Sequence, residues 1–581
     1  MEQIEFNLLR EPWIRVMRQD CSVQECSLTE VLLDSHKYLR LAGELPTQDV
    51  AILRLLLAVL HTVFYRVDPE GDEAPIEEEF DAIDRWEELW NMGRFPERAI
   101  CEYLKTWEDR FWLFHPEYPF YQVPGIDKKG TRYDAAKLNG ELSESQNKTR
   151  LFPLRIGESK KRLSYAEAAR WLISIMGFDD SSGKPKGDKK PQEKTPGAAK
   201  GKDKEKKAKE KLPSSGVGWL GKFDLIYAVG DTLFETLMLN LVLLKDRNEP
   251  WAEPKPVWER ERPKSAERTE IAMPDNQAEL LTLQSRRILL NRKDGIVNEY
   301  ALIGGDFFGD EALKYAFSEQ MMQWRVIRKK RGQKPKNIPA QVDANRQMWR
   351  DFESIVDNNQ GARIPGVAMW IRELKQEGCV SKRYIHFAAV GVSYGDKNSS
   401  IADIIYDHLD FHASLLDEAG KLWTNIIQKK IMQTQEAAQY LGKLAADIYQ
   451  AKSGQAYSKA KNAKAANAEI DRVKNQAEQD YYAAVDLPFR EWLRSIDPEQ
   501  GNDQLFRDEK DRQWREEAYK IALRQGESMV RGAGDIAFVG RWIKNGDKED
   551  FFSSSKAYNV FSAKLRACFD FKERIKEAAY E

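Results

Sequence analysis

Side chains that bind metals or attack substrates are few and scattered in this chain of 581 residues. There are six histidines and five cysteines, and no two cysteines form a CxxC pair. His408 and His412 stand four residues apart in a segment that we expect to be helical, so both rings would share one helix face. A zinc peptidase motif places Glu directly after the first histidine, where this chain has Leu409. Two histidines without a third ligand indicate surface or core residues, and we expect no metal site.

The sequence G-V-G-W-L-G-K-F at residues 216–223 is close to the phosphate-binding pattern GxxxxGK[ST]. That pattern requires Ser or Thr at its last position to bind magnesium, and this chain has Phe223 there. No strand pattern precedes Gly216, so we expect no nucleotide site. The sequence thus favours a protein that is not an enzyme and has no cofactor. The alternative is a metal-dependent hydrolase or nuclease that uses dispersed carboxylates, which are plentiful here.

A short polar turn at residues 394–400 separates two patterned segments. Residues 384–392 alternate and are rich in β-branched and aromatic residues, which predicts a strand. Residues 401–416 carry apolar residues at helical spacing, and Ser399 or Ser400 suits an N-cap, which predicts a helix. A strand–turn–helix junction can hold a polar tip rigidly. An ordinary solvated connection is the alternative.

The segment at residues 111–123, FWLFHPEYPFYQV, is dense in aromatic residues and is interrupted by two prolines. Large aromatic side chains are mostly buried, which favours an irregular loop anchored in the core. The alternative is an exposed aromatic platform for a ligand.

The chain is too long for one hydrophobic core, and its pattern changes near residue 400. Residues 1–400 mix strand-like and helical patterns, while residues 401–581 are almost purely helical in period. Beyond 401–416, helices are expected at 415–451, 475–496, 511–529 and 553–577. We therefore expect an α+β fold, with a mixed α/β N-terminal domain followed by a C-terminal four-helix bundle.

Residues from about 180 to 216 form a lysine-rich insertion without aromatic residues, which predicts a disordered loop. It is either a solvating linker or an electrostatic arm that reaches toward phosphates. The whole chain has 91 basic and 93 acidic residues, which argues against a simple polycation. Scattered cysteines, an acidic N-terminus and the lack of a long apolar run lead us to expect a cytoplasmic protein, neither secreted nor in a membrane.

Several segments, in this order and spacing, resemble the CasA family, the large subunit of the type I-E CRISPR Cascade surveillance complex. They are FNLLREPWI at 6–14, FHPEYPFYQ at 114–122, GWLG at 218–221, DTLFET at 231–236 and the closing bundle. The resemblance implies a non-enzymatic subunit of antiviral defence without a cofactor. It also implies that the subunit recognises the PAM of target double-stranded DNA from the minor groove and helps to open the duplex for crRNA pairing. The implied partners are crRNA-bearing Cascade subunits and the Cascade helicase-nuclease.

The resemblance also assigns residues to these tasks. A wedge that meets the PAM and splits the duplex corresponds to Asp396, Lys397, Asn398 and Ser399, with Asn398 where the family often has glutamine. A lysine that contacts the PAM from another loop corresponds to Lys314. A loop that contacts the crRNA end and nearby DNA, at about 147–156, contributes Asn147, Lys148, Arg150, Phe152 and Arg155. Some relatives carry clustered cysteines near the Lys314 loop, and because this chain has none there we expect no metal. A non-catalytic scaffold with solvated connectors is a further alternative.

Overall fold

The computed structural model describes residues 4–128, 130–140, 142–143, 148–149, 155–181, 216–221, 223–245, 248–261, 268–309, 312, 316–327, 336–356, 363–458, 463–499, 503–545 and 548–571. Two compact units form. The N-terminal unit comprises residues 1–344, 358–381 and 385–408, and the C-terminal unit comprises 345–357, 382–384 and 409–581. The fold is α+β, as the sequence predicts.

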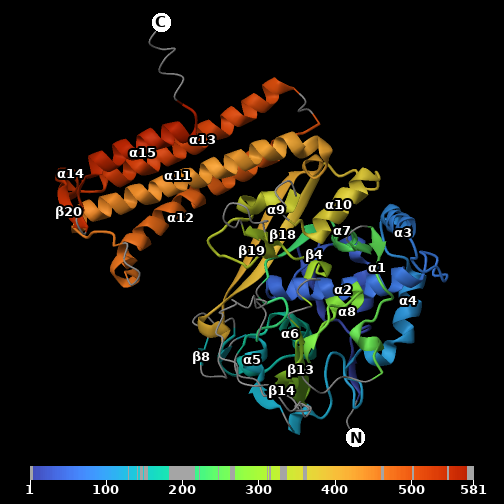
Figure 1. Cartoon of the computed structure of the whole chain (residues 1–581). Helices are drawn as coiled ribbons and strands as arrows, with labels where there is room; N and C mark the ends of the chain where they lie inside the picture. Colours follow the sequence, from blue (N-terminus) through green and yellow to red (C-terminus); the bar gives the residue numbers. More distant parts are fainter. Residues whose placement is uncertain are drawn as a thin grey trace, which may run out of the picture. The chain divides into compact units, whose positions relative to one another are not determined.

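Helix α2 (Pro46–Arg66) is the central element of the N-terminal unit (Figure 1). Proline in its first turn costs no hydrogen bond there and suits the helical φ. The helix packs against α6 (Tyr165–Phe178), α7 (Leu233–Asn240) and α8 (Gln277–Leu281). Its length and composition would allow it to cross a membrane, yet 94% of its most apolar window is buried inside the structure. It is therefore a core helix, as its apolar residues on every side require.

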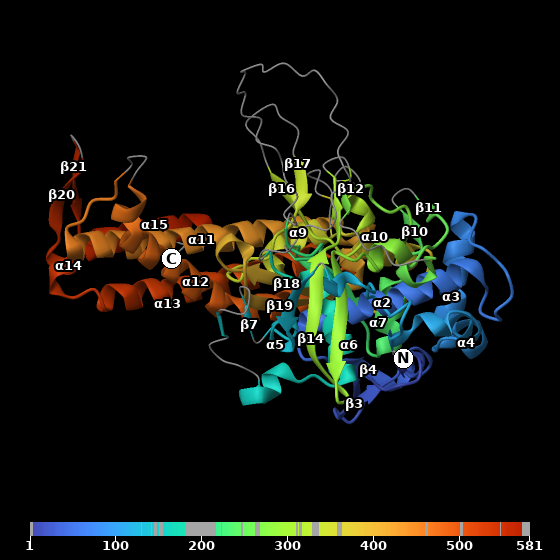
Figure 2. The same ribbon diagram turned by 90° about the horizontal axis from the view of Figure 1, so that it is seen from below.

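Among the residues that the structure describes, three sheets have three strands each. Their strand orders are β3-β2-β4 (Val23–Cys26, Ile14–Arg18, Tyr38–Leu41), β13-β14-β6 (Arg286–Lys293, Ile296–Gly304, Thr131–Asp134) and β19-β18-β9 (Ile401–His412, Tyr384–Tyr394, Leu225–Val229). Strands β13 and β14 form a hairpin, and its turn residues Asp294 and Gly295 have φ of 53° and 74°. Helix α6 contacts both strands of this hairpin, and Figure 2 shows it beside β14.

The remaining elements of the N-terminal unit are short or peripheral. The helices are α1 (Leu28–Leu33), α3 (Glu79–Met92), α4 (Glu97–Thr106), α5 (Ala135–Leu138) and α10 (Gly366–Gln376). The strands are β1 (Glu5–Asn7), β5 (Trp112–Phe114), β7 (Leu142–Ser143), β8 (Lys148–Thr149), β10 (Leu244–Lys245), β11 (Glu249–Pro250), β12 (Arg268–Ile271), β15 (Asp306–Phe308), β16 (Trp324–Ile327) and β17 (Lys336–Pro339).

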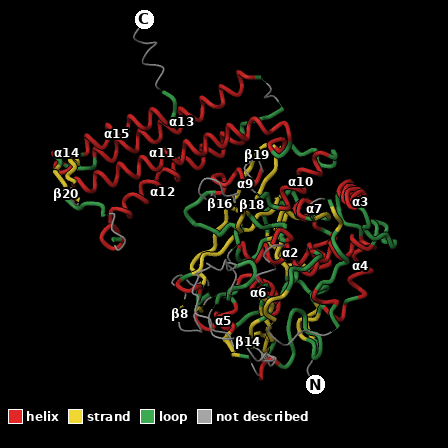
Figure 3. The backbone as a smooth tube through the Cα atoms, in the orientation of Figure 1, coloured by secondary structure: helices red, strands yellow, loops and turns green. Residues whose placement is uncertain are grey.

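The C-terminal unit contains the expected four-helix bundle. Figure 3 draws its members as long helical tubes: α11 (Lys421–Ser453), α12 (Lys464–Arg494), α13 (Gln504–Arg531) and α15 (Ser554–Cys568). Between α13 and α15 lie the short helix α14 (Asp535–Val539) and the hairpin β20–β21 (Arg541–Asn545, Lys548–Phe552), which the sequence analysis did not foresee. Aromatic rings fill the bundle, with Phe489 and Trp514 meeting edge to face at 4.9 Å.

Residues 345–357, which include helix α9 (Phe352–Val356), belong to the C-terminal unit although they precede it by some 50 positions. Trp349 stacks on Phe489 of α12 with ring centroids 4.3 Å apart. Its indole Nε1 donates to Asp486 Oδ1 at 2.8 Å. A buried tryptophan with a satisfied N–H thus fixes this segment to the bundle.

The prediction of a helix at residues 401–416 is wrong. Residues 401–412 form strand β19, which lies next to β18 in the sheet. Apolar residues at 401, 404, 405 and 409 fit a helical period, but the segment is rich in isoleucine and aromatic residues and follows a tight turn. Cross-strand pairing in a hairpin therefore decided the outcome over local period. The unit boundary falls after His408, within this strand.

Candidate nucleic-acid interface

The polar turn of residues 394–400 is the tip of the long β18–β19 hairpin. Gly395 N–H donates to Ser400 O at 2.9 Å, and Asn398 N–H donates to Gly395 O at 3.0 Å. Lys397 and Asn398 both have left-handed backbone, with φ of 54° and 59°. Asparagine tolerates this region, whereas lysine enters it at a cost of about 1 kcal/mol. Two consecutive left-handed residues thus shape a compact knuckle rather than an extended loop.

The side chains of this knuckle face solvent to different degrees. Lys397 is exposed, and Asn398 and Ser399 are half-buried. Only the backbone of Asp396 is described, as part of a single helical turn over Asp396–Asn398. The structure therefore brings the four residues assigned to the wedge together at one hairpin tip, where the Lys397 side chain is exposed.

The loop expected to contact crRNA is described only in part. Arg155 is half-buried, and its guanidinium lies 2.8 Å from Glu167 Oε1 and 3.3 Å from Glu44 Oε2. Burial opposes its charge, but the carboxylates of Glu167 and Glu44 outweigh burial and raise the pKa of Arg155. Glu167 also completes a capping box with Ser164 at the start of α6. Arg155 thus ties the end of the loop to that helix.

The other residues assigned to nucleic-acid contact are not placed. Lys148 is described by its backbone alone, in the short strand β8 that pairs with β7. Asn147, Arg150, Phe152 and Lys314 lie outside the described residues, as does the insertion from residue 182 to 215.

The described residues of this motif, 216–221 and 223, do not form a phosphate-binding loop. The amide of Gly218 donates to Asp179 O, and that of Leu220 donates to Gly177 O, each at 2.9 Å. The amide of Trp219 donates to Ser285 Oγ at 2.9 Å. A phosphate loop must keep its amides available for the ligand, and here they bind the protein itself.

The sequence G-V-S-Y-G at 391–395 matches the G-x-S-x-G pattern of serine hydrolases, a match that the sequence analysis overlooked. A nucleophile elbow needs a sharp turn at the serine, between a strand and a helix. Ser393 instead lies within β18, and a hairpin turn and strand β19 follow it. The match therefore carries no catalytic geometry.

The two histidines considered as metal ligands do not share a helix face, because both lie in strand β19. Four residues along a strand separate them by roughly 13 Å. His412 instead lies near Asp497 and Glu499, with possible ligand atoms all within 4.8 Å of one another. The Asp497 carboxylate is 2.8 Å from the Arg383 guanidinium, and His412 Nδ1 accepts from Ser414 N–H. A neighbouring guanidinium opposes a bound cation, and we assign no metal to this cluster.

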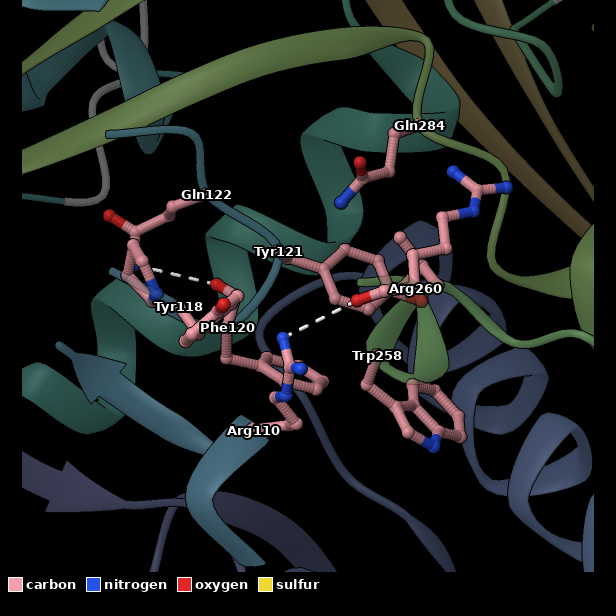
Figure 4. Close-up of a pocket in the computed structure, with 10 residues that line it drawn as sticks. Arg110, Tyr118, Phe120, Tyr121, Gln122, Trp258, Arg260 and Gln284 are labelled. Carbon is pink, nitrogen blue, oxygen red and sulfur yellow. Dashed lines mark hydrogen bonds between the residues drawn. The ribbon is translucent and has the colours of Figure 1, made fainter. Parts of the chain in front are cut away.

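The aromatic segment 111–123 packs into the core. Phe111 and Phe120 are buried and stack with ring centroids 5.0 Å apart. Beside them is a small cavity, which Figure 4 shows with the Arg110 side chain extending toward Arg260. Arg110 lies over the ring of Tyr118 at 3.7 Å and donates to the main-chain oxygen of Arg260 at 3.3 Å. The Arg260 guanidinium pairs with Glu279 at 3.1 Å. Both arginines are therefore occupied by protein groups, and core anchoring, not a ligand platform, accounts for the segment.

Comparisons with known proteins point to one family. A curated relative, CRISPR-associated protein CasA/Cse1 of Thermus thermophilus, is 28% identical over 382 residues, which span 64% of this chain and 64% of that protein. The crystal structure of Thermobifida fusca Cse1 matches with a TM-score of 0.72 at 27% identity, over 98% of this chain and 99% of that one. Cse1 from Acidimicrobium ferrooxidans matches with a TM-score of 0.69 at 23% identity, over 98% and 100% of the two chains. The family model of CRISPR-associated protein Cse1 matches residues 7–525, and the chain therefore belongs to the Cse1 (CasA) family.

Proposed function

We propose that this chain is the large subunit of a crRNA-guided Cascade complex, and that it recognises the PAM of target double-stranded DNA from the minor groove. The observation that carries the proposal is the left-handed knuckle at Lys397 and Asn398, which stands at the tip of two strands of 11 and 12 residues. A chain of a CRISPR RNA-guided surveillance complex shares this fold, with a TM-score of 0.61 over 97% of the present chain. That likeness, at 15% identity, concerns the fold alone.

The chemistry of the tip suits a reader of the minor groove. That groove presents mainly acceptors on A·T pairs and adds one amino donor on G·C pairs, so its pattern is degenerate. The amide of Asn398 offers both donors and an acceptor, and the Lys397 ammonium offers donors and a charge for nearby phosphates. Such a tip discriminates among a few short sequences, while base pairing with the guide reads the remainder.

Duplex opening follows from the stiffness of the same tip. Separating one base step costs a few kcal/mol, and a wedge delivers that energy only if it does not deform first. A hairpin tip with internal hydrogen bonds at 395–400 loses little conformational entropy on contact with DNA. The wedge thereby favours the opened state in which crRNA pairing begins.

Two further roles belong to the proposal. The insertion between 182 and 215 holds 12 lysines and five acidic residues, which favours phosphate attraction for the flanking duplex or the displaced strand. The opened complex then recruits the Cascade helicase-nuclease, which carries out cleavage, so this chain itself needs no catalytic group. The site of action is the cytoplasm, where invading DNA is met.

The test measures PAM-dependent binding of target double-stranded DNA by a reconstituted complex that contains this chain at full length. We expect the double variant K397A/N398A to lose PAM-dependent binding in a gel-shift assay while the complex still assembles. A matched control is K293A/D294A in the β13–β14 turn, which also removes an exposed lysine and a left-handed polar residue from a hairpin. Normal binding by K397A/N398A would refute the wedge assignment.

The alternative functions give other outcomes. DNA cleavage by the isolated chain that depends on a metal would favour a nuclease. DNA affinity that does not fall with rising salt, or no affinity at all, would favour a scaffold.

A further inference from the structure

Ser181 contacts the knuckle from a part of the chain more than 200 residues away. Its amide donates to Asn398 O at 2.8 Å. Its hydroxyl oxygen lies 2.8 Å from Lys397 O and 2.9 Å from Asn398 O. A hydroxyl has one proton, so it is shared between the two carbonyls or alternates between them. One serine thus satisfies both carbonyl groups of the left-handed residues.

The two residues before Ser181 are held by buried charged groups. They are Asp179 and Asp180, whose carboxylates pair with buried Arg286 and Lys137 respectively. Arg286 also donates to Asp180 O at 2.8 Å and to Gly216 O at 3.0 Å. The position of Ser181 is therefore set by the sheet that contains β13, independently of the knuckle.

The bonds from Ser181 select the backbone of the tip. Left-handed φ at Lys397 is unfavourable by about 1 kcal/mol, and it persists only where neighbouring groups hold the carbonyl in place. Without the hydroxyl, the Lys397 carbonyl loses its donor on this side and the residue can relax to ordinary backbone. Such relaxation would turn the Asn398 side chain, because the two residues share one peptide plane.

We propose that Ser181 is a positioning residue for PAM recognition, because it holds Lys397 and Asn398 in the left-handed form that presents the wedge to DNA. This inference rests on the proposed function and adds to it a residue outside the hairpin. It requires no contact between Ser181 and DNA. The hydroxyl group, rather than the size of the side chain, is the part that acts.

The experiment uses the reconstituted complex with full-length chain and compares S181A with S181T, which retains the hydroxyl. The readouts are the affinity for target DNA with and without a PAM, and the fluorescence of 2-aminopurine at the first base pairs beside the PAM. We expect S181A to lower the ratio of the two affinities about fivefold to tenfold, as for the loss of one hydrogen bond. S181T should restore the ratio. The control S22A removes an exposed hydroxyl from the β2–β3 turn and should change neither readout.

A purely structural role would reduce both affinities, or assembly itself, in the same proportion. Such a proportional loss would overturn the inference. So would an unchanged ratio in S181A, or an equal loss of the ratio in S181A and S181T. The variant K397A/N398A reports on the proposed function separately. If that variant loses PAM dependence while S181A keeps it, the wedge stands and the positioning role falls. In the background of N398A, S181A should lower the ratio by less than it does alone, because coupled residues are not additive.

Discussion

The phenol of Tyr394 donates a hydrogen bond to the main-chain oxygen of Phe178 at 2.7 Å, which joins the last residue of β18 to the last residue of α6. Burial raises the pKa of Tyr394 well above its usual value, so the phenol keeps its proton and remains a donor. Gly221 leaves room for this oxygen, since a Cβ there would lie 2.4 Å from it. The end of β18, next to the turn at residues 394–400, is thereby fixed to the helix that precedes the lysine-rich insertion.

Substitution Y394F tests this bond, because phenylalanine keeps the ring and removes only the hydroxyl. We expect the free energy of unfolding to fall by about 1–2 kcal/mol, since a buried carbonyl loses its donor. Thermal and denaturant unfolding of the purified chain measure the change. The control Y65F alters a half-buried tyrosine whose hydroxyl has no hydrogen bond among the described residues, and it should shift stability by less than about 0.5 kcal/mol. Equal stability of Y394F and the wild type would contradict the anchoring role.

The hairpin shows what sequence reasoning reached and where it stopped. The polar tip and the strand before it followed from alternation and turn residues, and β18 confirms that strand. The strand after the tip was missed, because isoleucines spaced for a helix also suit the edge of a sheet. Ser181 gave no local signal. Its partners are main-chain carbonyls more than 200 residues away, and only tertiary structure brings them together.

The long helices were the most predictable elements. Apolar residues at a period of 3.6 located the four bundle helices, because burial of one helix face dictates that period directly. The inclusion of residues 345–357 in the C-terminal unit could not be foreseen in the same way. It depends on tertiary contacts without a sequence pattern, such as Trp349 stacking on Phe489 and Arg350 lying over the ring of Tyr482.

Arg155 provides a second prediction. The resemblance implies that Arg155 contacts nucleic acid, whereas in the structure its guanidinium pairs with Glu167 and Glu44. We expect R155Q to lower the free energy of unfolding by about 1 kcal/mol, since these groups are only partly exposed. A double-mutant cycle with E167Q should reveal a coupling of similar size. Unfolding curves of the four proteins measure it. If R155Q lowers crRNA or DNA affinity with no change in stability and no coupling to E167Q, direct contact is the better account.

Asp49 provides a prediction for pH. Burial raises the pKa of this carboxyl to about 6, although Gly43 N–H and nearby arginines oppose the shift. In the unfolded chain its pKa is about 3.9. The folded state therefore binds the proton more tightly, and Asp49 makes the fold less stable as pH rises from about 4 to 6.

The variant D49N removes this titration and keeps an oxygen that can accept from Gly43 N–H. Relative to D49N, the wild type should lose stability between pH 4 and pH 6, by at most about 3 kcal/mol for a shift of two pKa units. Denaturant unfolding at several pH values measures the difference. A constant difference across this range would show that Asp49 is not shifted. The control E102Q removes an exposed carboxyl of helix α4, and the wild type should not lose stability relative to E102Q between pH 4 and pH 6.

The insertion between Ser181 and Gly216 supports a prediction about salt. Replacing residues 183–214 by a Gly/Ser linker of equal length removes all 12 of its lysines and leaves the described anchor at Ser181 in place. Each phosphate contact that a lysine makes adds about 0.9 to the slope of log affinity against log salt for duplex DNA. We therefore expect the linker variant to bind DNA more weakly at low salt, with a shallower slope, and to keep its preference for the PAM.

The measurement is affinity for PAM and non-PAM duplexes from low to high salt. A variant in which only the 12 lysines become glutamine keeps the five acidic residues, so it tests the loss of the lysine charges alone and should bind no more tightly than the linker variant. An unchanged slope would make the insertion a solvating connector, and a lost PAM preference would mean that it reads sequence as well as charge.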